Sequence, residues 1–149
     1  MLEKTERRPL NQISIIFVLL LLIPLGLSTK FYQGPGWLWV QLYAGDIFYP
    51  MFWFFLVMLI FPRSNTVLVS FLVFLSSTIV EFSQLLHGPV LIYLRQSFLG
   101  RVLVGTSFVW WDILYYFIGC VLALFLYDAL NFFCLPKTAS EPERHKNPL

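Results

Sequence analysis

Residues Val109–Phe133 read VWWDILYYFIGCVLALFLYDALNFF, an apolar run long enough to cross a membrane. A membrane-spanning helix needs roughly 20 mostly apolar residues. Three further apolar runs precede this one, at about 13–27, 46–61 and 66–86. Four such runs in a chain of 149 residues leave little length for anything else. The sequence therefore predicts an all-α transmembrane protein, a four-helix membrane bundle with an outer-facing interfacial loop between its third and fourth helices.

The composition agrees with a lipid environment. Hydrophobic residues make up 58% of the chain and charged residues 12%, about half the charged share of an average soluble domain. Aromatic residues reach 19%, which is typical of interfacial belts near the ends of membrane helices. No basic stripe points to nucleic acid. With two cysteines and no paired Cys/His spacing, we expect neither a metal nor another cofactor.

The distribution of Lys and Arg predicts the orientation, since cytoplasmic loops carry an excess of these residues. Seven of the ten lie in the two terminal segments and in the short turn around Arg63. We therefore expect a multi-pass protein of a bacterial cytoplasmic (inner) membrane with both termini in the cytoplasm. The predicted organisation is a cytoplasmic N-terminus over residues 1–12, one four-span domain over residues 13–133, and a disordered cytoplasmic tail over residues 134–149.

Carboxylates gather at the predicted outer ends of the spans. Asp46 opens the second span, Glu81 lies about one turn inside the third, and Asp112 opens the fourth. A carboxylate within a span is costly and needs a partner or a function. We expect Glu81 to pair with Arg101, so that Asp112 and Gln84 face a ligand. The candidate ligand-binding residues are Asp46, Glu81, Gln84, Arg95, Arg101, Asp112 and Tyr116. The structural alternative is that these polar side chains only tie the helices together.

Helical spacing places these residues on two faces. Ser70, Ser77, Glu81 and Gln84 share one face of the third span, because they recur at intervals of three, four and seven residues. On the fourth span, Asp112, Tyr116, Gly119, Ala123 and Tyr127 share another. Gly119 and Ala123 form a pair of small residues four apart, which lets helices approach closely. We expect Gly119 to lie between the third and fourth spans.

Several short stretches resemble a known family. Glu81-Phe82-Ser83-Gln84, Leu99–Gly105 and Trp110-Trp111-Asp112 look like domain of unknown function 2809, a bacterial family of small multi-pass membrane proteins. The layout is also similar to VanZ-like proteins, in which Glu-x-x-Gln at a helix end is followed by Arg and then Asp. Glu81, Gln84, Arg101 and Asp112 occupy those places here. VanZ is associated with resistance to the glycopeptide teicoplanin, which implies a role with envelope precursors.

Three functions follow from these observations. The leading hypothesis is binding or handling of an amphiphilic cell-envelope component through an outer-leaflet polar pocket, with membrane lipids and an envelope precursor as partners. The second is a small transport or accessory subunit with Glu81 as a proton or cation site. The third is an intramembrane hydrolase or transferase, which is disfavoured because HExxH, GxSxG and phosphate-loop motifs are missing from the sequence.

Overall fold

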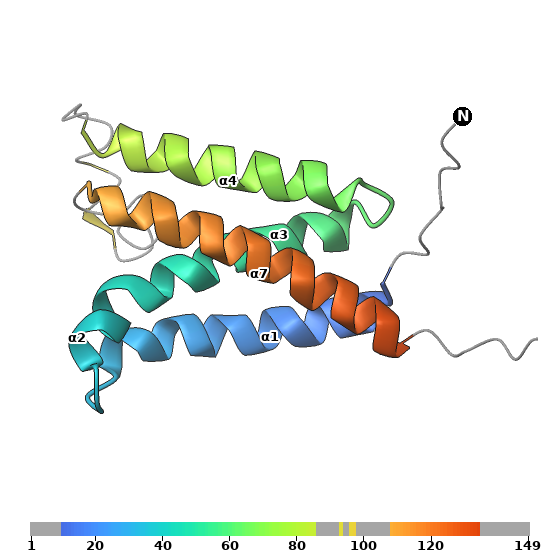
Figure 1. Ribbon diagram of the computed structural model, residues 1–149, viewed down its shortest axis with the longest axis horizontal. Coiled ribbons are helices and arrows are strands. Elements are labelled where there is room, and N and C mark those ends of the chain that lie inside the picture. The colour runs from blue at the N-terminus through green and yellow to red at the C-terminus, as the bar shows by residue number, and fades with distance from the viewer. Residues whose placement is uncertain (1–9, 86–92, 94–95, 98–107, 135–149) are drawn as a thin grey trace, which may run out of the picture.

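The computed structural model describes residues 10–85, 93, 96, 97 and 108–134. Its long helices are α1 (Gln12–Ser28), α3 (Gly45–Ile60), α4 (Thr66–Ser83) and α7 (Trp110–Cys134). The short elements are η1 (Thr29–Phe31), α2 (Trp37–Trp39) and η2 (Val40–Ala44). Figure 1 shows the long helices side by side, with α2 at one end of the bundle and the start of α1 and the end of α7 at the other. Because four helices are long and apolar enough to cross a membrane, the predicted all-α four-helix fold is confirmed; the interfacial loop predicted between the third and fourth helices lies almost entirely outside the described residues.

Asparagine side chains mark where two of the long helices begin. The Asn11 side chain accepts a hydrogen bond from the Ile13 N–H, at 3.2 Å. Asn65 Oδ1 accepts from the N–H groups of Val67 and Leu68, at 3.0 and 3.2 Å. The first N–H groups of a helix lack partners within the helix, and Asn is among the residues that satisfy them best.

The second membrane helix is longer than expected. Elements α2, η2 and α3 follow one another without a break, so the candidate span covers Trp37–Ile60 instead of beginning near Asp46. Gly36, at φ 72°, makes the left-handed turn into the helix, which glycine adopts at low cost. Pro50 consequently lies inside the helix and not in its first turn.

The π-helical segment η2 carries an unusual carbonyl contact. The Lys30 Nζ donates a hydrogen bond to the backbone oxygen of Gln41, at 3.0 Å. A π turn is wider than an α turn and is found mostly as a single turn, frequently at functional sites. The Gln41 side chain also reaches back, and its Nε2 donates to the Tyr32 backbone oxygen at 2.7 Å. The segment after α1 is thereby held against the second membrane helix.

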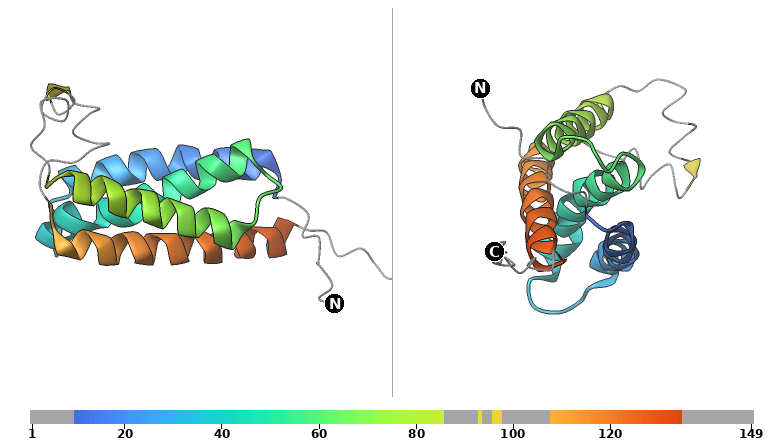
Figure 2. Two further views of the ribbon diagram at one scale, coloured as in Figure 1. Left: turned by 90° about the horizontal axis from the view of Figure 1, so that it is seen from above. Right: turned by 90° about the vertical axis from the view of Figure 1, so that its right-hand side faces the viewer.

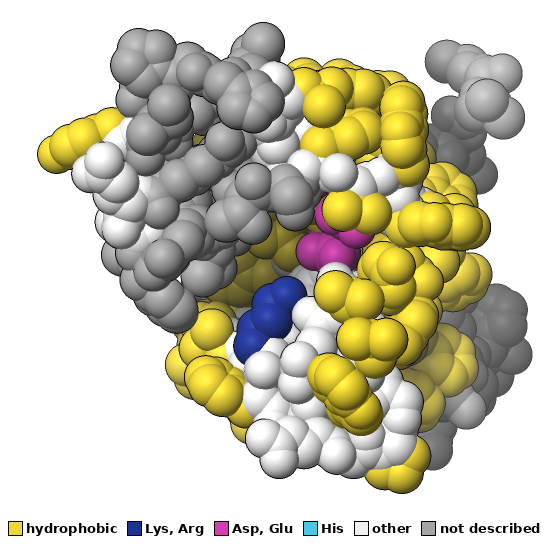
Figure 3. Space-filling view, turned by 90° about the vertical axis from the view of Figure 1, so that its left-hand side faces the viewer, with side chains coloured by type: hydrophobic (Ala, Val, Ile, Leu, Met, Phe, Trp, Pro, Cys, Tyr) yellow, Lys and Arg dark blue, Asp and Glu magenta, His cyan; other side chains and the backbone are white. Residues whose placement is uncertain are grey.

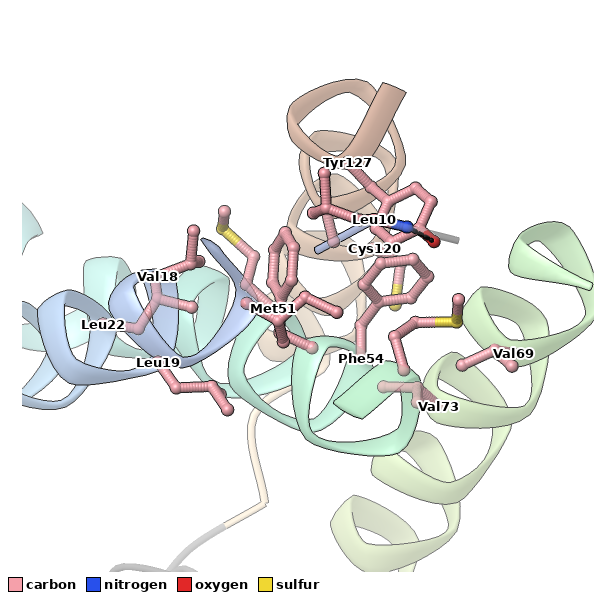
Figure 4. Close-up of a cluster of buried hydrophobic side chains, with 14 residues drawn as sticks. Leu10, Val18, Leu19, Leu22, Met51, Phe54, Val69, Val73, Cys120 and Tyr127 are labelled. Carbon is pink, nitrogen blue, oxygen red and sulfur yellow. Dashed lines mark hydrogen bonds between the residues drawn. The ribbon is translucent and has the colours of Figure 1, made fainter. Parts of the chain in front are cut away.

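The packing centres on α3. This helix contacts α1, α4 and α7, and α7 also contacts α4, an arrangement visible in the end view of Figure 2. The core contains Met51 and Phe54 from α3, Val73 from α4, and Cys120 and Tyr127 from α7 (Figure 4). Large apolar side chains on the outer faces of the helices stay exposed, as a lipid-facing surface requires.

A residue two positions before α1 belongs to this core. Leu10, which the sequence analysis placed in a cytoplasmic N-terminal segment, is 3% exposed. Its N–H donates a hydrogen bond to the Tyr127 hydroxyl, at 3.3 Å. The start of the described chain is therefore packed against the end of α7, where Tyr127 also contacts Phe54 with ring centroids 5.9 Å apart.

Gly119 lies where α7 packs tightly against α3. A Cβ built at this position would overlap the Ile47 carbonyl oxygen and would lie 2.6 Å from the Pro50 Cγ. Helical spacing predicts Gly119 between the third and fourth spans, and this prediction is wrong, because Gly119 lies against Ile47 and Pro50 of the second. The reason is that α7 packs on both α3 and α4, and spacing along α7 defines a face without naming the neighbour. Ala123, one turn further, is fully buried in the core.

Candidate functional site

Glu81 is completely buried and accepts three hydrogen bonds. Its Oε2 accepts from Gln84 Nε2 at 2.8 Å and from the Tyr116 hydroxyl at 3.0 Å. Its Oε1 accepts from the Val109 N–H at 3.0 Å. These donors come from the residue just after α4, from α7 and from the residue just before α7. The Glu81 carboxylate therefore ties the end of α4 to the beginning of α7.

The spacing of α4 explains why the carboxylate lies there. Ser70, Ser77 and Glu81 are buried on one face of α4, and Gln84 directly after the helix is buried with them, as expected. Ser70 Oγ donates to the Cys120 oxygen of α7, at 3.3 Å, so this face packs on α7. At the outer limit of the same face, Glu81 meets the N-terminus of α7, where the helix dipole favours negative charge.

Gln84 is held by Glu81, and one of its acceptor atoms has no donor among the described residues. The side chain is 7% exposed, and its Nε2 is used in the bond to Glu81. Its Oε1 is buried and accepts no hydrogen bond from the part of the chain that the structure describes. A buried amide oxygen without a donor costs free energy, so this atom is a candidate contact for a ligand.

The two arginines of the predicted site, Arg95 and Arg101, lie outside the described residues. The expected Glu81–Arg101 pair therefore stays a prediction. The donors that the structure describes around Glu81 are neutral: an amide, a hydroxyl and a backbone N–H.

Asp46 and Asp112 lie near Glu81 and are half-buried. The charges of all three carboxylates act on one another, and Lys30 attracts both Asp46 and Asp112. Figure 3 views the molecule from the α2 end and shows a recess with a hydrophobic floor and with acidic and basic side chains side by side at its rim. We call this feature the α2-end recess, with Lys30, Asp46 and Asp112 as its charged residues.

Lys30 is a site residue that the sequence analysis missed. It was counted only toward the orientation of the helices. Of the Lys and Arg residues that the structure describes, Lys30 lies at the α2 end, whereas Arg63 lies in the turn between α3 and α4 at the other end. A Cβ at Gly45 would come within 3.7 Å of the Lys30 ammonium, which places this cation over the residue that precedes Asp46. The sequence pattern that points to Lys30 is a single cation between the first span and a helix that begins with an aspartate.

Tyrosine pairs flank the acidic residues. Tyr43 stacks on Tyr115 with ring centroids 4.8 Å apart, and Tyr49 lies against Tyr116 at 6.0 Å. On α3 and the turn before it, the two tyrosines lie three residues before and three residues after Asp46. The Trp39 Nε1 donates a hydrogen bond to the Tyr115 hydroxyl at 2.9 Å, which holds Tyr115 in its position against Tyr43. Of these rings, only Tyr116 belongs to the site predicted from the sequence.

The described side chains of the site can accept and donate hydrogen bonds and can carry charge. Among the described residues, no three His, Cys, Asp or Glu side chains are grouped so that they could hold a metal ion. The carboxylates of Asp46 and Asp112 and the Gln84 oxygen can accept hydrogen bonds, and Lys30 can donate them.

The fold and the site together define a multi-pass membrane protein with a polar cluster at one end of its bundle. More specifically, residues 36–120 match the model of the family described as "Protein of unknown function (DUF2809)". This match covers more than half of the 149 residues, and the chain belongs to that family. It includes Asp46, Glu81, Gln84, Asp112 and Tyr116 and leaves out Lys30. No solved structure matches the chain.

Proposed function

We propose that this protein binds the polar head group of an amphiphilic membrane component in the α2-end recess. The observation that carries the proposal is the half-buried pair Asp46 and Asp112 beside Lys30, above a hydrophobic floor (Figure 3). A membrane amphiphile has one polar and one apolar part, and ligand sites combine apolar walls with a few placed polar groups. Glu81 acts in this proposal as a positioning residue, because its hydrogen bonds hold the start of α7, and so Asp112, against α4.

The resemblance to VanZ-like proteins adds a class of component to the proposal. The component would be a cell-envelope precursor or another envelope amphiphile, met by Asp112 and by the Arg101 of the VanZ-like layout. The protein would lie in a bacterial cytoplasmic membrane with both termini in the cytoplasm. The recess would then open toward the outer leaflet, since the start of α1 and the end of α7 lie at the opposite end of the bundle (Figure 1).

Cysteine labelling tests this orientation. Ser28, at the exposed end of α1, and Ser140, in the C-terminal segment, are replaced one at a time by cysteine. We expect an impermeant thiol reagent to label Ser28→Cys in intact cells and to label Ser140→Cys only after lysis, because the excess of Lys and Arg retains the terminal segments inside. Labelling of Ser140→Cys alone in intact cells would show that the orientation is the reverse of the proposed one.

Lipid retention tests the binding. The protein is purified in mild detergent, and the bound amphiphiles are identified by native mass spectrometry. We expect the Asp112→Asn variant to retain about tenfold less of the bound component, because the charged partner of the head group is lost. Asp128→Asn is the matched control, since it makes the same change on the exposed face near the other end of α7 and should retain as much as the unmodified protein.

The other results of this experiment also decide between functions. Equal retention by both variants would contradict the proposed site. If no amphiphile is retained, and if Glu81→Gln abolishes proton uptake by proteoliposomes, the proton-site alternative is favoured. The complete burial of Glu81 among neutral described donors is the observation that supports that alternative.

A further inference from the structure

The polar groups around the α2-end recess are unevenly divided between acceptors and donors. Asp46 and Asp112 are acceptors that carry charge, and Gln84 adds a buried oxygen without a described donor. Gln84 belongs to the same cluster, because its amide bonds to the Glu81 oxygen that also accepts from Tyr116, four residues after Asp112. The described acceptors therefore call for a ligand with N–H donors and a positive charge.

Lys30 is the complementary group, a cation that donates hydrogen bonds. An ammonium has three N–H donors, and the Gln41 oxygen uses one of them. Lys30 is exposed, and it lies close enough to Asp46 and Asp112 for their charges to attract. A ligand that places an anionic group at Lys30 and a cationic group at the two aspartates would match the site in both charges.

We propose that the head group bound in the α2-end recess is zwitterionic, with a primary ammonium close to a phosphate, as in a phosphoethanolamine head group. The ammonium contacts Asp46 and Asp112, and the phosphate contacts Lys30. This inference rests on the proposed function and names the chemistry that the site selects.

The acceptors of the site, including the Gln84 oxygen that has no donor among the described residues, would distinguish a primary ammonium from a quaternary one. A primary ammonium has three N–H donors, enough for the two carboxylates and one further acceptor. A trimethylammonium carries the same charge without any N–H donor, so it can form no hydrogen bond to the carboxylates or to an amide oxygen, and its binding should be weaker. A head group with a phosphate alone would be repelled by the two aspartates.

The test is a series of lipids with identical acyl chains and increasing N-methylation of the ethanolamine. The probes are phosphatidylethanolamine, its monomethyl and dimethyl forms, phosphatidylcholine, and phosphatidylglycerol as the anionic comparison. Each is titrated into delipidated full-length protein, and binding is read by native mass spectrometry. We expect stepwise weakening along the series, to about tenfold overall, as charge-assisted hydrogen bonds are removed.

Two variants complete the experiment. Asp112→Asn should remove the preference for phosphatidylethanolamine over phosphatidylcholine, and Asp128→Asn should keep it. Thermal unfolding in detergent verifies that both variants are folded. Equal binding of phosphatidylethanolamine and phosphatidylcholine would overturn the N–H selection while leaving amphiphile binding intact. Preferred binding of phosphatidylglycerol would overturn the zwitterion assignment. Binding of none of the five lipids would overturn this inference altogether. In that case the lipid-retention experiment alone decides whether the proposed function holds.

Discussion

The Gly119→Ala variant should unfold at a clearly lower temperature than the unmodified protein, with a loss of about 1–3 kcal/mol in stability, as is usual for overpacking. The added methyl group would overlap the Ile47 carbonyl oxygen and approach the Pro50 ring to 2.6 Å. The main atom in its way belongs to the backbone, which cannot rotate aside as a flexible side chain can. This expected loss of stability runs against intrinsic helix propensity, which favours Ala over Gly by about 1 kcal/mol. Thermal unfolding in detergent measures the effect, and Gly119→Leu should show a larger one.

Gly26→Ala is the matched control. A Cβ at Gly26 would lie 3.7 Å from the Phe48 Cβ, an ordinary van der Waals distance, so this variant should be neutral or slightly stabilised. Leu122→Ala provides a second comparison, because Leu122 is 44% exposed on the lipid-facing side and should lose little. A Gly119→Ala variant as stable as Gly26→Ala would show that α7 does not approach α3 at this point.

The second large effect is expected from the Glu81→Ala variant, which should lose about 3 kcal/mol or more, since unsatisfied buried donors cost about 1–3 kcal/mol each. The substitution leaves Gln84, Tyr116 and Val109 without the acceptor that they now share. Tyr116→Phe should lose only about 1 kcal/mol, typical of one hydrogen bond between membrane helices. Equilibrium unfolding in mixed detergent micelles compares the two.

Glu81→Gln separates charge from hydrogen bonding. Glutamine keeps one acceptor oxygen in place of two, so this variant should lose less than Glu81→Ala. A double-mutant cycle with Tyr116→Phe should give a non-additive result, because the two side chains are in contact. If Glu81→Ala proves as stable as the unmodified protein, the three hydrogen bonds do not hold α4 to α7.

The predicted Glu81–Arg101 pair is tested by a second double-mutant cycle, with amphiphile binding as the measurement. Combining Glu81→Gln with Arg101→Gln should weaken binding no more than either change alone, because two partners in one contact are non-additive.

Hydropathy and spacing predict much of this architecture. Each of the four apolar runs corresponds to a long helix, because the bilayer sets the length of the span. The buried face that runs from Ser70 to Gln84 follows from helical periodicity, which is a local property. The same reasoning identified Glu81 as the carboxylate that needs partners, and the structure provides three.

Features that depend on which helices are neighbours could not be predicted in this way. Periodicity indicates that Gly119 faces another helix, but not that the helix is α3. The segment from Trp37 to Ala44 has a Gly-Pro-Gly sequence before it and resembles an interfacial loop. It is helical because backbone groups near lipid must find partners within the chain. Lys30 joins the acidic cluster through the contact of its segment with Gln41, a non-local contact that sequence spacing does not reveal.

The π turn at Val40–Ala44 takes up one residue more than an α turn would within the second membrane helix. Each residue of a regular α-helix rotates the chain by about 100°, so a one-residue deletion within α3, before Asp46 is reached, would turn the tryptophans at 37 and 39 about a quarter-turn away from their present direction. The same deletion inside the π turn should instead restore an α turn and leave the tryptophans and Asp46 in nearly their present relative orientation. What it would change is the wide turn from which the Gln41 carbonyl accepts the Lys30 hydrogen bond. A one-residue change in this segment would therefore spare the aromatic anchor of the helix and act on the position of the cation beside its acidic site.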